Sequence, residues 1–248
     1  MSKKNIIFGT RAVIEAIESG KNFEKILIRK SRNSELQNEL LILLRKQRIP
    51  YQFVPIEKLN RTTGKNHQGV VAFLSEISYH KIEDIIPMLY EQGKNPLITI
   101  LDGVTDVRNF GAVARTAECA GMHAILIPAK GSAQINADAV KTSAGALHKI
   151  PVCRSMNLEQ SIEFLKNSGL EIIGASEKAS VYYDDLDYTK PTAIIAGAED
   201  KGISKQILAL CDHIAKIPIA GEIDSLNVSV STAIFAYEAV RQRKKSDK

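Results

Sequence analysis

The 248-residue sequence predicts an α/β protein with two units, a small N-terminal α/β unit and a larger one built on a doubly wound, mostly parallel sheet. Two observations predict this class. Short apolar segments of strand type alternate with amphipathic helical segments in both units, as in parallel sheets covered by helices. The two alternating sets, 1–78 and 97–243, are separated by a linker at 79–96 that holds one helix, and a basic tail follows at 244–248.

The N-terminal unit begins with a helix, which Thr10 can cap and Gly20 ends. Segment 23–28 predicts a strand. Residues 34–48 place four leucines on one helical face, and Pro50 stops that helix. The remaining elements are strands at 51–54 and 69–77, with a short helix at 56–59 and a polar turn at 61–69 between them.

The larger unit repeats the alternation with longer apolar strands. Such continuous apolar runs are typical of strands that are buried on both faces. Strands are expected at 97–102, 123–128, 171–176, 192–197 and 213–219. Helices are expected at 109–120, 136–146, 157–168, 204–211 and 227–243.

The composition is that of an ordinary globular protein, with 44% hydrophobic and 25% charged residues. It excludes a disordered, collagen-like or disulfide-rich chain. The three cysteines, Cys119, Cys153 and Cys211, are widely spaced, which argues against a disulfide framework and a thiolate zinc site. Cys119 is expected in the core. No segment predicts a signal peptide or a membrane span, so we expect a cytoplasmic protein.

The positive charge is concentrated at one end of the chain. Residues 1–78 hold 14 Lys and Arg against 7 Glu and no Asp, whereas the remaining residues hold 19 basic and 21 acidic side chains. A basic unit favours a polyanionic partner, but chance clustering on a solvated surface explains the asymmetry equally well.

Several common sites are absent from the sequence. It contains neither G-x-G-x-x-G nor G-x-S-x-G, and its five histidines lack the spacing of metal ligands. Segment 197–204 resembles a phosphate-binding loop, but Ile203 stands where that loop needs a lysine. We therefore expect no metal.

Three polar or glycine-rich segments follow predicted strands: 101–121, 194–204 and 217–239. In open α/β sheets this carboxyl edge is where ligands bind. The segments carry Asn109, Glu199, Ser225 and Asn227, although Asn109, Ser225 and Asn227 could simply cap helices. Arg115 lies within a helix suited to close packing, and a buried arginine needs an anionic or hydrogen-bonding partner.

The three segments resemble the ordered motifs of the SpoU (TrmH) branch of SPOUT RNA methyltransferases. They read DGVTDVRNFGAVARTAECAG, IIAGAEDKGIS and IPIAGEIDSLNVSVSTAIFAYEA. Further segments are similar to bacterial 23S ribosomal RNA guanosine 2′-O-methyltransferases: IFGTRAVIEAI, HQGVVA and SAQINADAVKTSAGAL. The resemblance covers nearly the full length, up to about Arg243.

This resemblance implies a trefoil-knotted α/β domain that binds S-adenosylmethionine, an N-terminal L30e-like RNA-binding domain, and a homodimer. It assigns catalytic or substrate-positioning roles to Asn109, Arg115, Glu199, Ser225 and Asn227. It assigns the cofactor to Gly197, Ile217 and Leu226. The chain departs from the family pattern at Val107, where proline is frequent, and at Asp200, where glycine is usual. Val107 is expected to loosen the turn before Asn109.

The implied reaction is methyl transfer to the ribose 2′-hydroxyl of a guanosine in 23S ribosomal RNA. The family assigns proton removal to Arg115. A guanidinium stays protonated, however, so orienting a phosphate or stabilising an oxyanion suits it better. Asn109 is expected to act from a turn, since it and Arg115 need not share a helical face. The RNA contacts are expected at Arg11, Arg29, Lys30, Arg32, Arg61 and Lys65. Two alternatives stay open: a transfer RNA ribose methyltransferase, and a non-catalytic RNA-binding ribosome-assembly protein of the same fold.

Overall fold

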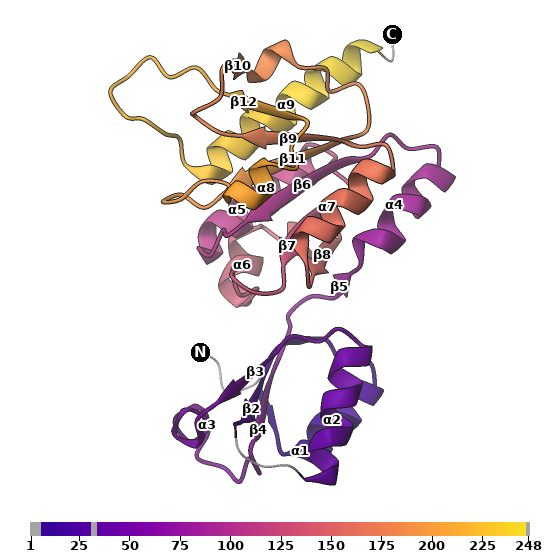
Figure 1. Cartoon of the computed structure of the whole chain (residues 1–248), viewed down its shortest axis with the longest axis vertical. Helices are drawn as coiled ribbons and strands as arrows, with labels where there is room; N and C mark the ends of the chain where they lie inside the picture. The colour runs from indigo at the N-terminus through magenta and orange to yellow at the C-terminus, as the bar shows by residue number, and fades with distance from the viewer. Residues whose placement is uncertain (1–5, 31–33, 247–248) are drawn as a thin grey trace. The chain divides into compact units, whose positions relative to one another are not determined.

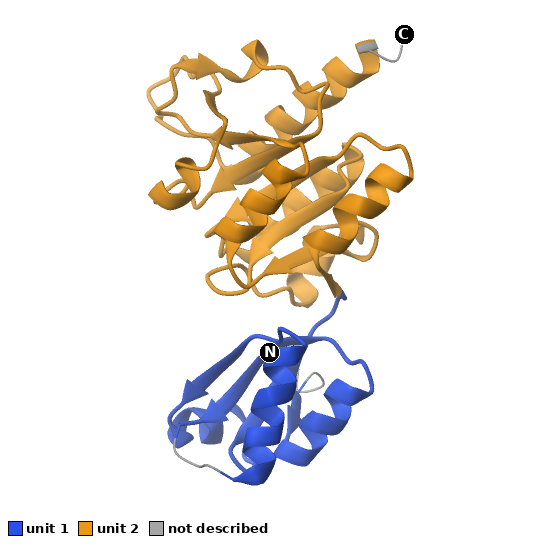
Figure 2. Ribbon diagram, turned by 45° about the vertical axis from the view of Figure 1, so that its right-hand side comes forward, with its two compact units in different colours: residues 1–78 blue, residues 79–248 orange. Residues whose placement is uncertain are grey.

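The computed structural model describes residues 6–30 and 34–246, and its contacts divide the chain into unit 1, residues 1–78, and unit 2, residues 79–248 (Figures 1 and 2). Both units are α/β.

Unit 1 is a four-stranded sheet with helices on both faces. Its elements are β1 (Ile6–Phe8), α1 (Thr10–Glu18), β2 (Phe23–Arg29), α2 (Glu35–Lys46), β3 (Tyr51–Val54), α3 (Ile56–Thr62) and β4 (Val70–Leu74). The strand order is β1-β4-β2-β3, in which only β2 and β3 pair in parallel. One face forms a core with α1 and α2, and Leu59 of α3 packs on the other.

Two details of unit 1 differ from the sequence predictions. Gly9, with φ +91°, occupies the cap position of α1, and Thr10 is the first helical residue and is buried. Its hydroxyl therefore does not cap the helix. Strand β1 was not predicted, because three residues are too few to show a period, and its pairing with β4 is a tertiary contact.

Unit 2 contains an eight-stranded sheet in the order β10-β12-β9-β11-β6-β7-β8-β5, and every pair in it is parallel. Its strands are β5 (Tyr79–His80), β6 (Leu97–Asp102), β7 (Ala124–Pro128), β8 (Val152–Ser155), β9 (Glu171–Ala175), β10 (Val181–Tyr182), β11 (Thr192–Gly197) and β12 (His213–Lys216). The predicted parallel sheet is thus confirmed.

Helices cover both faces of this sheet (Figure 1). One layer holds α4 (Ile82–Glu91), α7 (Leu158–Asn167) and α8 (Lys205–Leu208), whose apolar residues share one core cluster. The other layer holds α5 (Val107–Cys119), α6 (Ala137–Thr142) and α9 (Val228–Ser246), with α5 packed on both α6 and α9. The threaded knot implied by the family resemblance stays a prediction.

Segment 79–96, expected to be a linker, is instead part of unit 2. Strand β5 pairs with β8, and Ile82, Ile86 and Leu89 of α4 are buried in the core of unit 2. The expected basic tail begins inside α9, which continues to Ser246, and residues 247–248 lie outside the described part of the chain. Strands β5, β8 and β10 were missed because strands of two to four residues are defined mainly by their neighbours.

Arg243 holds the C-terminal end of α9 in place through hydrogen bonds. Its guanidinium donates hydrogen bonds to four backbone carbonyls at 2.7–3.0 Å, those of Asn95, Pro96, Tyr188 and Lys190. A planar guanidinium has enough donors for such a set, whereas a lysine ammonium has three on one atom. Arg243 therefore links the end of α9 to the segments that precede β6 and β11.

Cys119 is exposed on α5, which corrects its expected place in the core. It lies on the solvent side of the helix, whereas Ala117 and Ala114 face the interior. Burial raises the pKa of the Cys153 thiol to about 12 and that of Cys211 to about 11. Within 6–30 and 34–246, no helix has the length and apolarity to cross a membrane.

Candidate active site

The site lies where β6 and β11 end side by side. These strands pair in register, with Gly197 opposite Asp102 at their carboxyl ends. From β6 the chain proceeds through β7 and β8 to one side, whereas β9 and β12 lie on the other side. Ligands of open α/β sheets bind at such a switch point. The sequence segments after the two strands are therefore brought together, as the sequence predicted.

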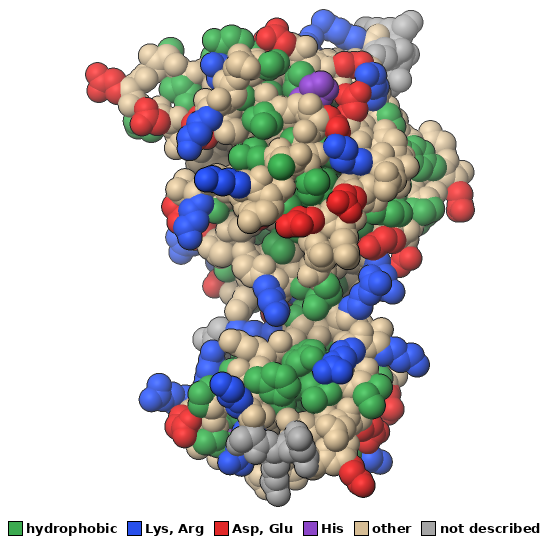
Figure 3. Space-filling view, in the orientation of Figure 1, with side chains coloured by type: hydrophobic (Ala, Val, Ile, Leu, Met, Phe, Trp, Pro, Cys, Tyr) green, Lys and Arg blue, Asp and Glu red, His purple; other side chains and the backbone are tan. Residues whose placement is uncertain are grey.

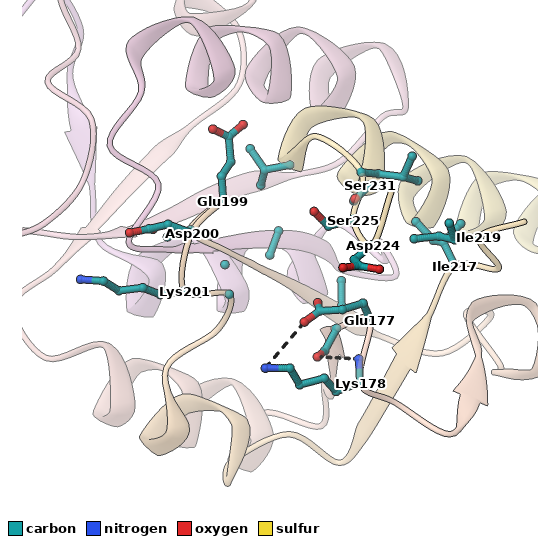
Figure 4. Close-up of a pocket in the computed structure, with 18 of the residues that line it drawn as sticks. Glu177, Lys178, Glu199, Asp200, Lys201, Ile217, Ile219, Asp224, Ser225 and Ser231 are labelled. Atoms are coloured by element: carbon teal, nitrogen blue, oxygen red, sulfur yellow. Dashed lines mark hydrogen bonds and ion pairs between the residues drawn. The ribbon is translucent and has the colours of Figure 1, made fainter. Parts of the chain in front are cut away.

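A pocket of about 300 Å³ opens at this edge. It is lined by the ends of β9 and β11, the loop between β12 and α9, and the first turns of α9 (Figure 4). Glu199 lies on one side of the pocket, and Ser225 and Asp224 lie on the other (Figure 4). All three residues predicted to contact a cofactor, Gly197, Ile217 and Leu226, line it.

The turn after β11 depends on the absence of a side chain at Gly197. A Cβ there would overlap the backbone of Gly202 and Ile203. The turn is closed by two backbone hydrogen bonds between Ala198 and Gly202, and Gly202 adopts φ +66°. The Asp102 carboxylate accepts a hydrogen bond from the Ser204 amide at 2.8 Å, which ties the turn to the end of β6. This tight turn presents Glu199 at the pocket.

Helix α5 starts with a well-formed cap. Asp106 is the N-cap, and its Oδ1 accepts a hydrogen bond from the Asn109 amide at 2.7 Å. Val107 is the first helical residue, so the turn is held by Asp106 although the family's proline is absent. The loosening expected from Val107 is not seen.

Three of the predicted residues form one hydrogen-bond network. The amide of Asn109 donates to Glu199 Oε1 at 2.6 Å, and that of Asn227 donates to the same oxygen at 2.8 Å. Asn227 also donates to Asn109 Oδ1 at 3.1 Å. A carboxylate that accepts two amide donors fixes both amides in orientation. Asn109 acts from within α5, which corrects its expected place in a turn.

Asn227 both caps helix α9 and belongs to the hydrogen-bond network. Its Oδ1 accepts hydrogen bonds from the Ser229 amide and hydroxyl at 2.9 and 2.6 Å, so it caps the start of α9 while its amide nitrogen serves the network. Asn109 is not a cap, because Asp106 is. Ser225 is exposed at the pocket and caps no helix.

Arg115 is exposed, which corrects the expectation that it is buried. It lies almost two turns along α5 from Asn109, and the residues facing the core of this helix are Val113, Ala114 and Ala117. It does not line the pocket, and no described residue forms an ion pair or hydrogen bond with its guanidinium. Its guanidinium is therefore available to an external anion.

The residues predicted to bind RNA lie in unit 1. Arg29 and Lys65 line one hollow there. Arg11, Lys30 and Arg61 are exposed, and Arg11 forms an ion pair with Glu15 at 3.6 Å. Arg32 lies outside the described residues. Their role in RNA binding stays a prediction.

Sequence reasoning missed several pocket residues, among them Ser176, Asp224 and Phe235. Ser176 is the last residue of the predicted strand 171–176, at the same edge of the sheet, so its position at the end of a strand was a usable signal. Phe235 is contributed by the second turn of α9 and had no such signal. Within the described residues, no group of three or more His, Cys, Asp and Glu side chains could hold a metal ion.

Comparisons with known proteins show which family the chain resembles. Residues 96–237 match the model of the SpoU rRNA Methylase family, and residues 6–80 match a model described as RNA 2′-O ribose methyltransferase substrate binding. A protein of Staphylococcus saprophyticus named as a TrmH family tRNA/rRNA methyltransferase is 35% identical over 96% of each chain. YacO of Bacillus subtilis, similarly named, is 32% identical over 96% of this chain and 95% of its own.

The fold has solved counterparts as well. The crystal structure of the SpoU methyltransferase AviRb from Streptomyces viridochromogenes, in complex with its cofactor AdoMet, is 26% identical with a TM-score of 0.61. It covers 97% of this chain and 90% of that one. Because the family model matches residues 96–237 and the two relatives match 96% of the chain, the chain belongs to the SpoU rRNA methylase family, and its class is that of the RNA 2′-O-ribose methyltransferases.

Proposed function

We propose that this protein transfers a methyl group from S-adenosylmethionine to the ribose 2′-hydroxyl of a guanosine in 23S ribosomal RNA. The observation that carries the proposal is the network of Asn109, Glu199 and Asn227 beside a pocket at the ends of β9 and β11. It combines a site for a small cofactor with oriented hydrogen-bonding groups next to it.

The pocket suits the cofactor in size and in lining. Its volume of about 300 Å³ lies at the lower end of the range for small-molecule sites. Gly197 brings the backbone of the turn to its wall, and Ile217, Ile219 and Leu226 provide apolar surface. Asp224 and Glu177 add carboxylates that suit the positive charge of a sulfonium cofactor. When bound, the cofactor supplies an electrophilic methyl group.

The chain's own residues hold and polarise the substrate. A ribose hydroxyl is a weak nucleophile, so it must be oriented and helped to lose its proton. Asn109, held by Glu199, keeps one amide N–H that can donate to the ribose, whereas both N–H groups of Asn227 are used within the network and hold Asn109 and Glu199 in place. Arg115, which is exposed, orients an RNA phosphate or stabilises the developing oxyanion.

The proposed assembly is a homodimer formed through α9. Val230 and Tyr237 are seven residues apart on this helix, on one side of it, and are 46% and 50% exposed. Aromatic side chains such as Tyr237 are enriched in protein interfaces. Sedimentation of the wild type and of Tyr237→Asp tests this assembly, and a monomeric wild type would contradict it.

The decisive experiment measures tritium-methyl transfer to naked 23S RNA, 16S RNA and transfer RNA. We expect transfer to 23S RNA, lost when one guanosine is already 2′-O-methylated, and also lost in Arg115→Ala while cofactor binding is retained. Transfer to transfer RNA alone would favour the second candidate, which the names of the two curated relatives also allow. No transfer to any RNA would favour a non-catalytic role.

A further inference from the structure

Unit 2 contains a second hollow, of about 330 Å³, at the carboxyl edge of its sheet. It lies where β6 and β7 end and where α7 and α8 begin. It shares no lining residue with the pocket proposed for the cofactor, and Asn109, Glu199 and Asn227 do not line it. We call it the edge hollow. It is therefore open to a ligand other than the cofactor.

The edge hollow adjoins the turn that carries Glu199. Asp102 and Ser204 both line it, and the 2.8 Å hydrogen bond between them ties this turn to the end of β6. Gly103 lines it as well, and a Cβ built there would lie 3.5 Å from the Ala198 Cβ. Residues 197–202 of the same turn line the cofactor pocket. A ligand in the edge hollow therefore lies next to the residues that surround the cofactor.

Two side chains of opposite charge line the edge hollow without forming an ion pair. Glu159 and Lys130 are both exposed, and neither forms an ion pair or a hydrogen bond through its charged group with any residue that the structure describes. A carboxylate only accepts hydrogen bonds, and an ammonium only donates them. A ligand that serves both groups must therefore present donors to one and acceptors to the other.

The backbone on which these two groups stand is fixed. Lys130 follows Ala129, whose amide donates a hydrogen bond to the Ser155 carbonyl at 2.7 Å. Glu159 lies in the first turn of α7, which is capped by the Asn157 side chain. On the face of unit 2 seen in Figure 3, acidic and basic side chains are interspersed. Selection at the edge hollow therefore depends on matched hydrogen-bonding groups rather than on a charge of one sign.

The edge hollow also has apolar walls. Pro128, Leu158 and Ile207 line it, and Leu158 and Ile207 are only 9% and 4% exposed. Apolar walls with a few polar groups are typical of small-molecule sites. A flat ring can pack its faces against such walls while its edges reach the two charged side chains.

Among the four bases of RNA, guanine matches this set of groups. Its N1–H and its N2 amino group donate side by side, which suits the Glu159 carboxylate. Its O6 and N7 are acceptors, which suit the Lys130 ammonium. Adenine, cytosine and uracil have no second donor beside the first, so they satisfy the carboxylate less well.

We infer that the edge hollow binds the guanine base of the RNA nucleoside that is methylated. Glu159 accepts hydrogen bonds from N1–H and the N2 amino group, and Lys130 donates to O6 or N7. Enzymes that act on one nucleotide read the edge of its unstacked base in this way. The inference rests on the proposed function for the identity of the RNA, and it assigns the choice of guanosine to residues of unit 2.

The test measures binding of guanosine, inosine and adenosine 5′-monophosphates (GMP, IMP and AMP) to the full-length protein by equilibrium dialysis. Saturating S-adenosylhomocysteine keeps the nucleotides out of the cofactor pocket. IMP differs from GMP only in lacking the N2 amino group. We expect the wild type to bind GMP about tenfold more tightly than IMP, and AMP more weakly than IMP.

Three variants separate the two edges of the base. Glu159→Gln is expected to bind GMP about tenfold more weakly and to lose the preference over IMP. Lys130→Ala is expected to weaken GMP and IMP by the same factor, because both carry O6 and N7. The matched control is Glu163→Gln, which removes the same charge one turn further along α7 at an exposed position that does not line the hollow. Its affinities are expected to stay within about twofold of the wild type.

Equal binding of GMP and IMP by the wild type, equal losses in Glu159→Gln and Glu163→Gln, or no nucleotide binding would overturn the inference. Tritium-methyl transfer to naked 23S RNA is measured on the same preparations. Glu159→Gln is expected to lower kcat/KM about tenfold with unchanged cofactor affinity, and an unchanged kcat/KM would show that the bound guanine is not that of the methylated nucleoside.

The two measurements distinguish failure of this inference from failure of the proposed function. Wild-type methyl transfer without a preference for GMP refutes the guanine site alone. A preference for GMP that depends on Glu159, without any wild-type methyl transfer, refutes the enzyme activity and leaves a guanine-binding site.

Discussion

Replacing Gly197 with alanine tests whether the tight turn after β11 shapes the cofactor pocket. The added Cβ would overlap backbone atoms of Gly202 and Ile203, closer than real Cβ atoms approach their neighbours. Backbone cannot be relieved by a rotamer change, so the turn must move as a whole. Overpacking typically costs about 1–3 kcal/mol, and a backbone collision belongs at the upper end of that range.

The expected effects are on both stability and affinity. For a chain of this length 1 kcal/mol corresponds to about 2–4 °C, so we expect Tm to fall by about 6–12 °C in differential scanning calorimetry. The displaced turn carries Glu199 and lines the pocket, so S-adenosylmethionine should bind at least about tenfold more weakly by titration calorimetry, a loss of about 1.4 kcal/mol.

The matched control is Gly221→Ala, in the loop between β12 and α9. No heavy atom lies within 4 Å of a Cβ built there, and its φ is outside the left-handed region. Its stability should stay within about 0.5 kcal/mol of the wild type, as for most surface substitutions. If Gly197→Ala kept both its Tm and its cofactor affinity, the steric argument for this turn would be refuted.

Three further substitutions test other contacts. Glu199→Gln keeps one acceptor oxygen for both amides but loses charge assistance, so initial methyl-transfer rates should fall about tenfold with little change in Tm; an unchanged rate would contradict this. Arg243→Lys cannot serve four carbonyls, and urea denaturation should show a loss of about 2 kcal/mol, whereas exposed Lys244→Ala should show almost none. Gly111→Ala improves helix propensity by about 1 kcal/mol, but its Cβ would lie 2.8 Å from the Ala139 carbonyl oxygen, so net destabilisation by about 1 kcal/mol is expected in the same assay. A measured stabilisation of Gly111→Ala would show that helix α6 moves to make room for the added Cβ.

Some strands were predicted from the sequence with their observed bounds, and others were not predicted. The strands at 51–54, 97–102 and 192–197 have the predicted bounds. The two longer strands are apolar runs between polar or turn residues, and prolines flank strand 51–54 on both sides. The short strands β1, β5, β8 and β10 were not predicted. Their residues are defined by hydrogen bonds to strands distant in sequence, and a local pattern contains no such information.

At the candidate site, too, some properties of single residues were visible in the sequence and others depend on tertiary contacts. The position of Asn109, Glu199 and Asn227 after strands was visible in the sequence, but their shared hydrogen bonds depend on β6 and β11 being neighbours. The exposure of Arg115 depends on which side of α5 packs against α6 and α9. Neither the order of strands in the sheet nor the packing of the helices follows from the local period of hydrophobic residues.

By itself, the sequence determined the α/β class, the parallel sheet, the basic first unit and the three segments that resemble the methyltransferase motifs. These are local properties, since hydrophobic period, charge and motif spacing are each contained in a short stretch of chain. The tertiary structure alone decided that the amides of Asn109 and Asn227 meet on the Glu199 carboxylate, and that Arg115 is exposed on α5. Both depend on contacts between segments far apart in the chain, and only folding brings these segments together.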